Sequence, residues 1–216
     1  MDKKLMLAVA GAGKTTYLIN RLNEVQNSII VTYTINNYNS IRSAIINKFK
    51  YIPSNIKIYT YFSFLYNFCF RPFERNINSK GLQYGTIIEK NAKSNQLRYY
   101  MNMKSRKMYA GRLAKLCNAK IIDRIKKRIE KYFKYLFIDE IQDFAGNDFN
   151  FIRSLEECNI NILYVGDFYQ HTFDTSRDGN TNFNIFSDYK NYTDKLKNRI
   201  LSLDNTSLIK SRRCTQ

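Results

Sequence analysis

The chain has 216 residues, 44% of them hydrophobic, which is enough for one sizeable domain or for one domain with an insertion. Its 35 lysine and arginine residues outnumber its 18 aspartate and glutamate residues, and the formal net charge of +17 favours a polyanionic partner. No apolar run reaches the roughly 18 residues of a membrane span and the N-terminus lacks the pattern of a secretory signal, so we expect a cytoplasmic protein that does not enter a membrane.

The first predicted element is a short strand that ends at Leu7, and a loop of small residues follows it. Residues 8–15 fit the pattern of Ala or Gly, four residues, then Gly, Lys and Ser or Thr, and a helix-like stretch comes next. Small residues let consecutive backbone N–H groups turn toward an anion, and the start of a helix adds partial positive charge. Lys14 is expected to reach the β- and γ-phosphates of a nucleotide, and the Thr15 hydroxyl to bind Mg²⁺. A plain glycine-containing turn is the alternative.

The next elements alternate between strand and helix patterns. β-Branched and aromatic residues predict a second buried strand over residues 28–34, and apolar residues between 41 and 49 have the spacing of one helix face. Residues 56–70 predict a strand that continues as an aromatic-rich helix.

The pattern weakens from residue 71 to about residue 96, after which helices are predicted over residues 97–107 and 119–133. Residues 90–134 hold 15 lysine and arginine residues and only two acidic residues, so most of the net charge lies here. Like charges at this density repel one another, and a bound polyanion explains them better than a solvated surface, which remains the alternative.

Two later apolar runs end in polar residues. Residues 135–139 lead directly into Asp139 and Glu140, and residues 161–167 repeat this form, with Gln170 three residues further on. A Mg²⁺-dependent nucleotide hydrolase needs such a pair of acids, Asp139 to hold the metal and Glu140 to polarise the attacking water. Two acids at the start of a helix are the alternative. The alternation of strands and helices predicts an α/β fold whose parallel sheet binds ligands at the carboxyl ends of its strands.

In this order and spacing, the motifs resemble those of the UvrD/Rep-type superfamily 1 DNA helicases. The similar segments are residues 8–16 (motif I), 31–45 (Ia), 58–65 (Ib), 138–144 (II), 165–173 (III) and 208–215 (IV). The D-E-x-Q-D form of motif II is the most specific of them. The resemblance implies a RecA-like P-loop NTPase domain with a parallel β-sheet over residues 1–70 and 132–216, and an inserted, mostly helical and basic subdomain over residues 71–131.

The resemblance also implies ATP and Mg²⁺ as cofactors and a single-stranded nucleic acid as partner, DNA in the first place, with RNA left open. Lys14, Asp139, Glu140 and Gln170 would be catalytic, and Thr15 and Asp139 would hold the metal. The nucleotide would contact Ala10, Gly11, Ala12, Gly13, Lys14, Thr15, Thr16, Gln170 and Arg213. The nucleic acid would contact Thr32, Thr34, Asn36, Thr60, Phe62 and Phe173, and the basic segment would add Lys126, Lys127 and Arg128. Gln142 would lie between the nucleotide and the nucleic acid.

Three features of the family pattern are absent from this sequence. They are the adenine-reading glutamine segment, the tryptophan after motif III, and the second RecA-like domain with its arginine finger. We therefore expect a second RecA-like domain in cis beyond residue 216 or in trans, and weak or no unwinding by this chain alone. Two other hypotheses stay open. One is a nucleotide-switched, nucleic-acid-binding subunit of a multi-protein system such as phage defence, and the other is a small P-loop kinase.

Overall fold

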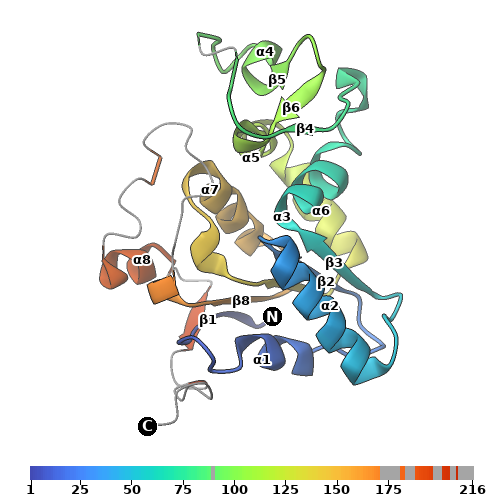
Figure 1. The fold of residues 1–216 in the computed structure, drawn as a ribbon, viewed down its shortest axis with the longest axis vertical. Helices are drawn as coiled ribbons and strands as arrows, with labels where there is room; N and C mark the ends of the chain where they lie inside the picture. The colour runs from blue at the N-terminus through green and yellow to red at the C-terminus, as the bar shows by residue number, and fades with distance from the viewer. Residues whose placement is uncertain (89–90, 171–180, 183–187, 197–200, 205–207, 209–216) are drawn as a thin grey trace.

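A computed structural model describes residues 1–88, 91–170, 181–182, 188–196, 201–204 and 208. In Figure 1 a layered α/β body occupies the lower part of the molecule, and the residues between β3 and β7 extend above it. The chain starts in the middle of the lower body, at the strand β1.

The lower body is built on a six-stranded sheet in the order β3-β2-β7-β8-β1-β9. Every pair of neighbouring strands in this sheet runs parallel. The strands are β1 (Lys3–Leu7), β2 (Ser28–Thr32), β3 (Ile56–Thr60), β7 (Tyr135–Ile138), β8 (Asn161–Gly166) and β9 (Ser202–Asp204). The predicted α/β fold with a parallel sheet is therefore confirmed.

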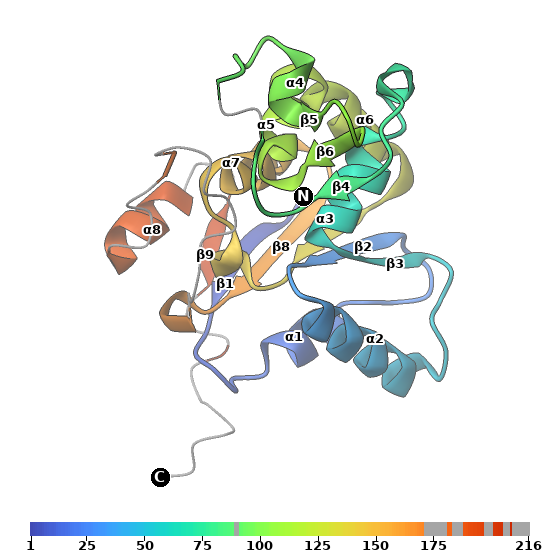
Figure 2. The ribbon, with the colours of Figure 1, turned by 45° about the horizontal axis from the view of Figure 1, so that its top comes forward.

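Helices cover both faces of the sheet, as Figure 2 shows. One face carries α1 (Lys14–Asn20) and α2 (Ile35–Phe49), and the other carries α3 (Tyr61–Ser63), α5 (Ala110–Lys120), α6 (Ile122–Tyr132) and α7 (Gly146–Ser154). Successive strand side chains point to opposite faces, so Leu5 joins the core on one side and Met6 the core on the other. Burial on both faces explains why the central strands β2, β7 and β8 are largely apolar in the sequence.

The residues between β3 and β7 form a second, three-stranded sheet of order β4-β6-β5 together with helices. Its buried side chains, such as Met101, Met108 and Leu113, belong to the same hydrophobic cluster as one face of the large sheet. The elements here are η1 (Phe64–Phe70), η2 (Arg75–Ile77), β4 (Leu82–Gln83), α4 (Leu97–Tyr100), β5 (Met101–Asn102) and β6 (Lys107–Tyr109), followed by α5 and α6. The remaining short elements of the described residues are η3 (Ile141–Asp143), η4 (Leu155–Glu157), η5 (Phe168–Gln170) and α8 (Tyr189–Leu196).

The helix predicted over residues 97–107 is wrong beyond its first turn. Only Leu97–Tyr100 is helical, and the rest forms the antiparallel pair β5 and β6. The side chain of Asn102 accepts hydrogen bonds from the backbone N–H groups of Lys104 and Ser105, and Arg106 has a φ of 56°. An asparagine that bonds its own backbone two residues on favours a turn over a helix.

Most other predicted elements are found close to where the sequence puts them. The helix predicted over residues 119–133 is α6, but the preceding helix α5, from Ala110, was not predicted. The aromatic-rich helix is largely the π-helix η1, in which each N–H bonds five residues back. Among the described residues, none of the helices combines the length and the apolar character that a membrane span requires.

Candidate functional site

The loop between β1 and α1 has the backbone form of an anion-binding turn. Gly11 and Gly13 have φ values of 73° and 91°, in the region that favours glycine. Gly13 is the N-cap of α1 and supplies no side-chain hydrogen bond to the first turn of the helix. The first-turn N–H groups have no partner within the helix either, so they are available to an anion at the mouth of the loop.

Lys14 lies folded back over this loop and is only 8% exposed. Its Nζ donates hydrogen bonds to the carbonyl oxygens of Ala8, at 3.1 Å, and Val9, at 3.4 Å. The same nitrogen lies 3.6 Å from Oδ2 of Asp167, at the end of β8. The first residue of α1 therefore links the loop to the next strand of the sheet. Thr15 is partly buried and Thr16 exposed beside it.

Asp139 follows β7 and is almost fully buried, with 3% of its surface exposed. Burial, and then the charge of Glu140, raise the pKa of this carboxyl to about 7, although a hydrogen bond from Thr32 and the charge of Lys14 lower it. The Thr32 hydroxyl donates to Oδ2 of Asp139 at 3.4 Å. This corner of the sheet thus holds a desolvated carboxylate close to a buried ammonium group.

Glu140 has an unusual backbone conformation, with φ and ψ both 53°. A non-glycine residue in this left-handed region is strained, and such residues concentrate at functional sites. The Nε2 group of Gln142 donates to Oε2 of Glu140 at 2.7 Å. Asp143 is buried nearby, and burial together with the charge of Glu140 raises its pKa to about 6. Three carboxylates thus lie at the turn after β7.

Gln142 also joins this turn to the end of β8, because its Oε1 accepts a hydrogen bond from the backbone N–H of Asp167 at 2.9 Å. The close approach of the Gln142 side chain to the end of β8 requires a glycine at position 166. A Cβ on Gly166 would lie 2.5 Å from Oε1 of Gln142 and 2.6 Å from Cγ2 of Ile141. The loops after β1, β7 and β8 are therefore connected through Lys14, Asp167 and Gln142.

The residues predicted to contact nucleic acid are divided between buried and exposed positions. Thr32 is fully buried and bonded to Asp139, so its side chain does not face solvent. The Thr34 hydroxyl caps α2 by accepting from the N–H of Asn37 at 3.1 Å, while Asn36 is exposed. Thr60 is partly buried at the end of β3.

Phe62 is partly buried within a group of aromatic rings. Its ring centroid lies 5.2 Å from that of Tyr61, 5.9 Å from Tyr33 and 5.4 Å from the exposed Tyr84. Tyr33 and Tyr84 were not predicted as site residues. The signal that could have indicated them is that both are aromatic and that the chain is strongly basic. This group presents ring surface beside the carboxyl ends of β2 and β3.

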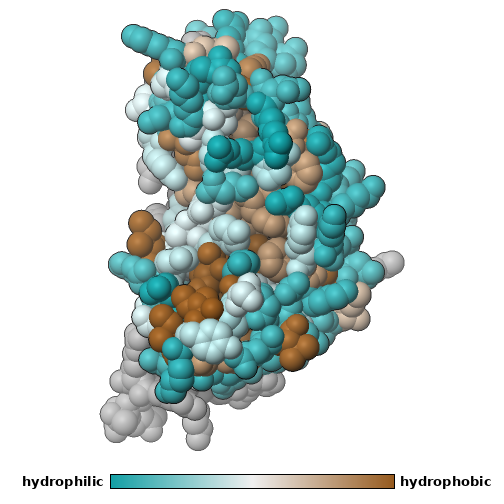
Figure 3. Space-filling model, turned by 90° about the vertical axis from the view of Figure 1, so that its right-hand side faces the viewer, coloured by the Kyte–Doolittle hydropathy of each residue, from teal (hydrophilic) through white to brown (hydrophobic). Residues whose placement is uncertain are grey.

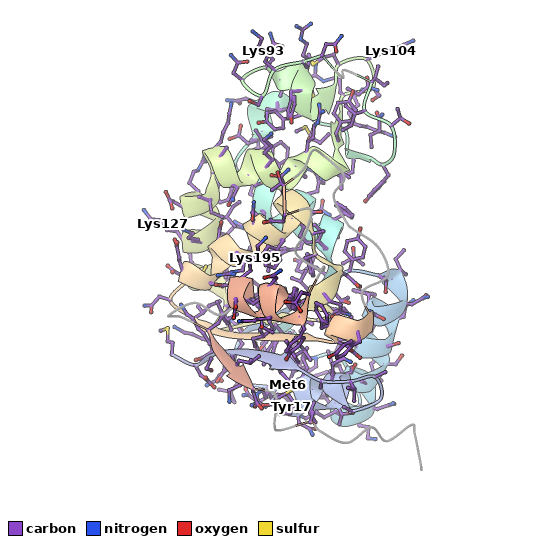
Figure 4. The ribbon with its side chains drawn as sticks, turned by 90° about the vertical axis from the view of Figure 1, so that its left-hand side faces the viewer. Met6, Tyr17, Lys93, Lys104, Lys127 and Lys195 are labelled. Carbon is purple, nitrogen blue, oxygen red and sulfur yellow. The ribbon has the colours of Figure 1, made fainter. Side chains whose placement is uncertain are left out.

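The basic segment places its three predicted residues in different surroundings. Lys126 forms ion pairs with Glu157 and, at 3.7 Å, with Asp123. Arg128 has its guanidinium 4.8 Å from the ring centroid of Phe68 and 5.2 Å from that of Tyr132. Lys127 is exposed and points away from the body of the molecule in Figure 4. Two of the three are therefore already engaged within the protein.

Three predicted site residues cannot be placed in the same way. Phe173 and Arg213 lie outside the described residues, and Gln170 is described only as the last residue of the short helix η5.

Asp167 was not among the predicted site residues, yet it lies against Lys14. The signal for it was present, since it is the acid that directly follows an apolar strand.

Comparison with models of known protein families gave no match, and no curated protein matched the chain either.

Proposed function

We propose that this chain binds ATP and Mg²⁺ at the edge formed by the loops after β1, β7 and β8, and hydrolyses the nucleotide there. The observation that carries the proposal is the convergence of Lys14, Asp139, Glu140 and Asp167, which three separate strands deliver to one edge of the sheet. Ligands of open parallel sheets bind in crevices outside the carboxyl ends of the strands.

The order of the strands supports this assignment. The phosphate loop follows β1, the acids follow β7, and β8 lies between these strands. Neighbouring strands are about 4.8 Å apart, so the two loops begin about 10 Å from each other. The phosphate loop and the acids therefore flank the end of β8, where the phosphates of a nucleotide would lie.

Each side chain has a role that fits its surroundings. Lys14 would exchange its bonds to Ala8 and Val9 for contacts with the β- and γ-phosphates. Mg²⁺ would bind the Thr15 hydroxyl and the carboxylate of Asp139, and would offset the negative charge of the phosphates. The residues present fit a cation, because the carboxylates of Asp139 and Glu140 lie together at this turn, and the charge of Glu140 adds to burial in raising the pKa of Asp139. Glu140 would accept a proton from the attacking water.

We assign the chain to a RecA-like P-loop NTPase, the motor half of a UvrD/Rep-like superfamily 1 helicase, with residues 71–131 as its inserted subdomain. The placement of residues 71–131 between β3 and β7 supports this assignment. The proposal includes cytoplasmic location, a single-stranded nucleic acid as partner, and a second RecA-like domain in cis or in trans that completes the ATP site. The net charge of +17 supports a polyanionic partner.

A nucleotide-switched subunit of a nucleic-acid-binding complex is the second candidate, and the Gln142 bridge favours it over a kinase. A side chain that connects Glu140 with the end of β8 can transmit the state of the nucleotide to the rest of the sheet without turnover. Hydrolysis stimulated by single-stranded DNA supports the motor assignment, whereas tight nucleotide binding without stimulated hydrolysis supports the switch. Phosphate transfer to a nucleoside would indicate a kinase.

The test of the shared nucleotide site is calorimetry with MgATP. The wild-type protein should bind, and Lys14→Ala should weaken binding by about 10- to 100-fold, because one or two charge-assisted hydrogen bonds to phosphate are removed. Lys57→Ala, which removes an exposed lysine of β3, is the matched control and should bind like the wild type. Equal affinity of the Lys14→Ala and Lys57→Ala variants would refute the assignment.

A further inference from the structure

A basic site lies apart from the nucleotide site, where η1 meets the following loop and α6. It is a hollow of about 520 Å³, which we call the arginine hollow. Its size is within the range of about 300–1,000 Å³ that ligand sites occupy. Most of its lining is polar, and three arginines and one carboxylate give it a net charge of +2. The lining residues are Asn67, Arg71, Pro72, Glu74, Arg75, Asn78, Ser79 and Arg128.

The π-helix η1 forms one wall of the hollow. Six of its seven residues are buried and only Asn67 is exposed, and Asn67 lines the hollow. The wide π-turn ends where the backbone N–H of Arg71 donates to the carbonyl oxygen of Tyr66, five residues back. π-Helices are rare and occur frequently at functional sites. Here the buried aromatic residues hold the backbone rigidly, so the position of Arg71 is set by the core.

Arg128, on α6, also lines the hollow. Its guanidinium lies over the ring of Phe68, with 4.8 Å to the centroid, so the core also restricts this side chain. Its Nε is buried and has no hydrogen-bond partner among the residues that the structure describes. Within the part of the chain that the structure describes, no ion pair involves Arg71, Arg75 or Arg128, although Glu74 lines the same hollow. Three arginines therefore line one space, and among the described residues none of them is paired with a carboxylate.

We propose that the arginine hollow binds a phosphate group of the backbone of a single-stranded nucleic acid. Guanidinium groups match the oxygens of a phosphate with two parallel N–H donors, and the amides of Asn67 and Asn78 and the hydroxyl of Ser79 add neutral donors. The inference rests on the proposed function only in its choice of nucleic acid as the source of the phosphate.

The surrounding charge favours a strand over a small phosphate compound. The exposed Lys127 and Arg124 belong to α6, the helix that also carries Arg128. The side of the molecule in Figure 3 is mainly hydrophilic over its upper part. The exposed Lys93 and Lys104 lie at the top of the molecule in Figure 4. Positive charge spread over this much of the surface attracts a polyanion, whereas a free phosphate would need only the hollow itself.

The experiment measures the affinity of the full 216-residue chain for a fluorescent single-stranded oligonucleotide, at several salt concentrations. The test variant is Arg71→Glu/Arg75→Glu, and the matched control is Lys93→Glu/Lys104→Glu, which makes the same change in net charge at exposed lysines outside the hollow. The test variant should bind at least about tenfold more weakly than the control, because charge-assisted bonds to phosphate are removed. The slope of log affinity against log salt should fall by about 0.7 for each phosphate that the protein no longer neutralises. MgATP binding should be unchanged.

Two further arms identify the source of the phosphate and guard against misfolding. Arg71→Lys/Arg75→Lys keeps both charges and should recover part of the affinity, which a simply unfolded variant would not allow. Pyrophosphate binding is measured on the same variants. Equal oligonucleotide affinity of the test variant and the control would overturn the inference. The inference would also be overturned if the variants changed the binding of pyrophosphate but not that of the oligonucleotide.

The same measurements separate this inference from the proposed function. If the wild type binds MgATP but no oligonucleotide, this inference fails while the nucleotide site stands. If it binds the oligonucleotide through the hollow but no MgATP, the proposed function fails and this inference stands.

Discussion

The side chain of Gln142 accepts a hydrogen bond from the backbone N–H of Asp167, and this bond ties the turn after β7 to the end of β8. Both residues are buried, with 2% and 3% of their surfaces exposed. The same amide donates to Glu140. One neutral side chain thus holds the strained glutamate and the aspartate next to Lys14 in fixed positions.

Gln142→Ala should destabilise the protein by about 1–3 kcal/mol, because the buried N–H of Asp167 loses its acceptor. Urea unfolding followed by circular dichroism measures the change. Gln142→Met keeps most of the side-chain volume and also lacks an acceptor, so it should be destabilised by a similar amount. If the methionine variant is as stable as the wild type, the loss in the alanine variant comes from packing and the hydrogen bond contributes little.

Gly166→Ala should be destabilising by about 1–3 kcal/mol, because overpacking is costly. Its methyl group would press against Ile141 and Gln142 at 2.6 Å and 2.5 Å. Gly111→Ala is the matched control: nothing lies within 4 Å of a Cβ at this position in helix α5. It should be neutral or up to about 1 kcal/mol more stable, because alanine favours a helix. If the unfolding midpoints of the two variants shift in the same direction, the close contact of position 166 with Gln142 and Ile141 is contradicted.

The buried carboxyl of Asp139 predicts a pH dependence of stability. Its pKa is raised from 3.8 to about 7, so between these values the folded protein retains a proton that the unfolded chain has released. Unfolding then releases a proton, and stability falls as the pH rises through this window. Asp139→Asn cannot ionise, so its stability relative to the wild type should increase from about pH 4 to about pH 7.

Urea unfolding at several pH values in the presence of EDTA, which keeps divalent cations away, tests this expectation. A difference in unfolding free energy between Asp139→Asn and the wild type that is constant with pH would show that the carboxyl titrates normally. A difference that decreases with pH would show that its charged form is stabilised by the fold, contrary to the burial described here.

Glu140→Gln should retain MgATP binding and lose hydrolysis. The amide keeps the size of the side chain but does not accept a proton from water, and general base catalysis contributes about 10²–10⁴-fold in rate. Phosphate release in the presence of single-stranded DNA gives the rate, and calorimetry gives the affinity. Asp143→Asn removes a neighbouring carboxylate and serves as the control, with a smaller loss expected. Hydrolysis by Glu140→Gln at the wild-type rate would place the water-activating group elsewhere.

The strands that carry the site could be predicted because each one is buried on both faces. An apolar run that ends abruptly in Asp139 and Glu140 has few explanations other than a central strand leading into a polar edge. The order of the strands could not be predicted in this way. It depends on pairing between segments far apart in the chain, and the contact between Lys14 and Asp167 follows from that order.

Local chemistry explains the other misses. The segment after Leu97 has helix-forming residues, but Asn102 bonds its own backbone and turns the chain. In η1 nearly every residue is buried, so apolar spacing does not distinguish a π-helix from an α-helix. Lys126 was predicted from its charge alone, and the carboxylates that pair with it come from its own helix and from the short helix η4.

The position of β1 in the sheet has a consequence for how the protein folds during synthesis. This strand is complete once Leu7 has been made, but β8 and β9, between which it lies, are made only after residue 160. Until then β2 and β3 can pair with each other, whereas β1, which ends in three apolar residues, has two unpaired edges. Such segments favour aggregation, and late long-range pairing slows folding. We therefore expect nascent chains shorter than about 170 residues to need a chaperone, and the phosphate loop to acquire its final shape late in synthesis.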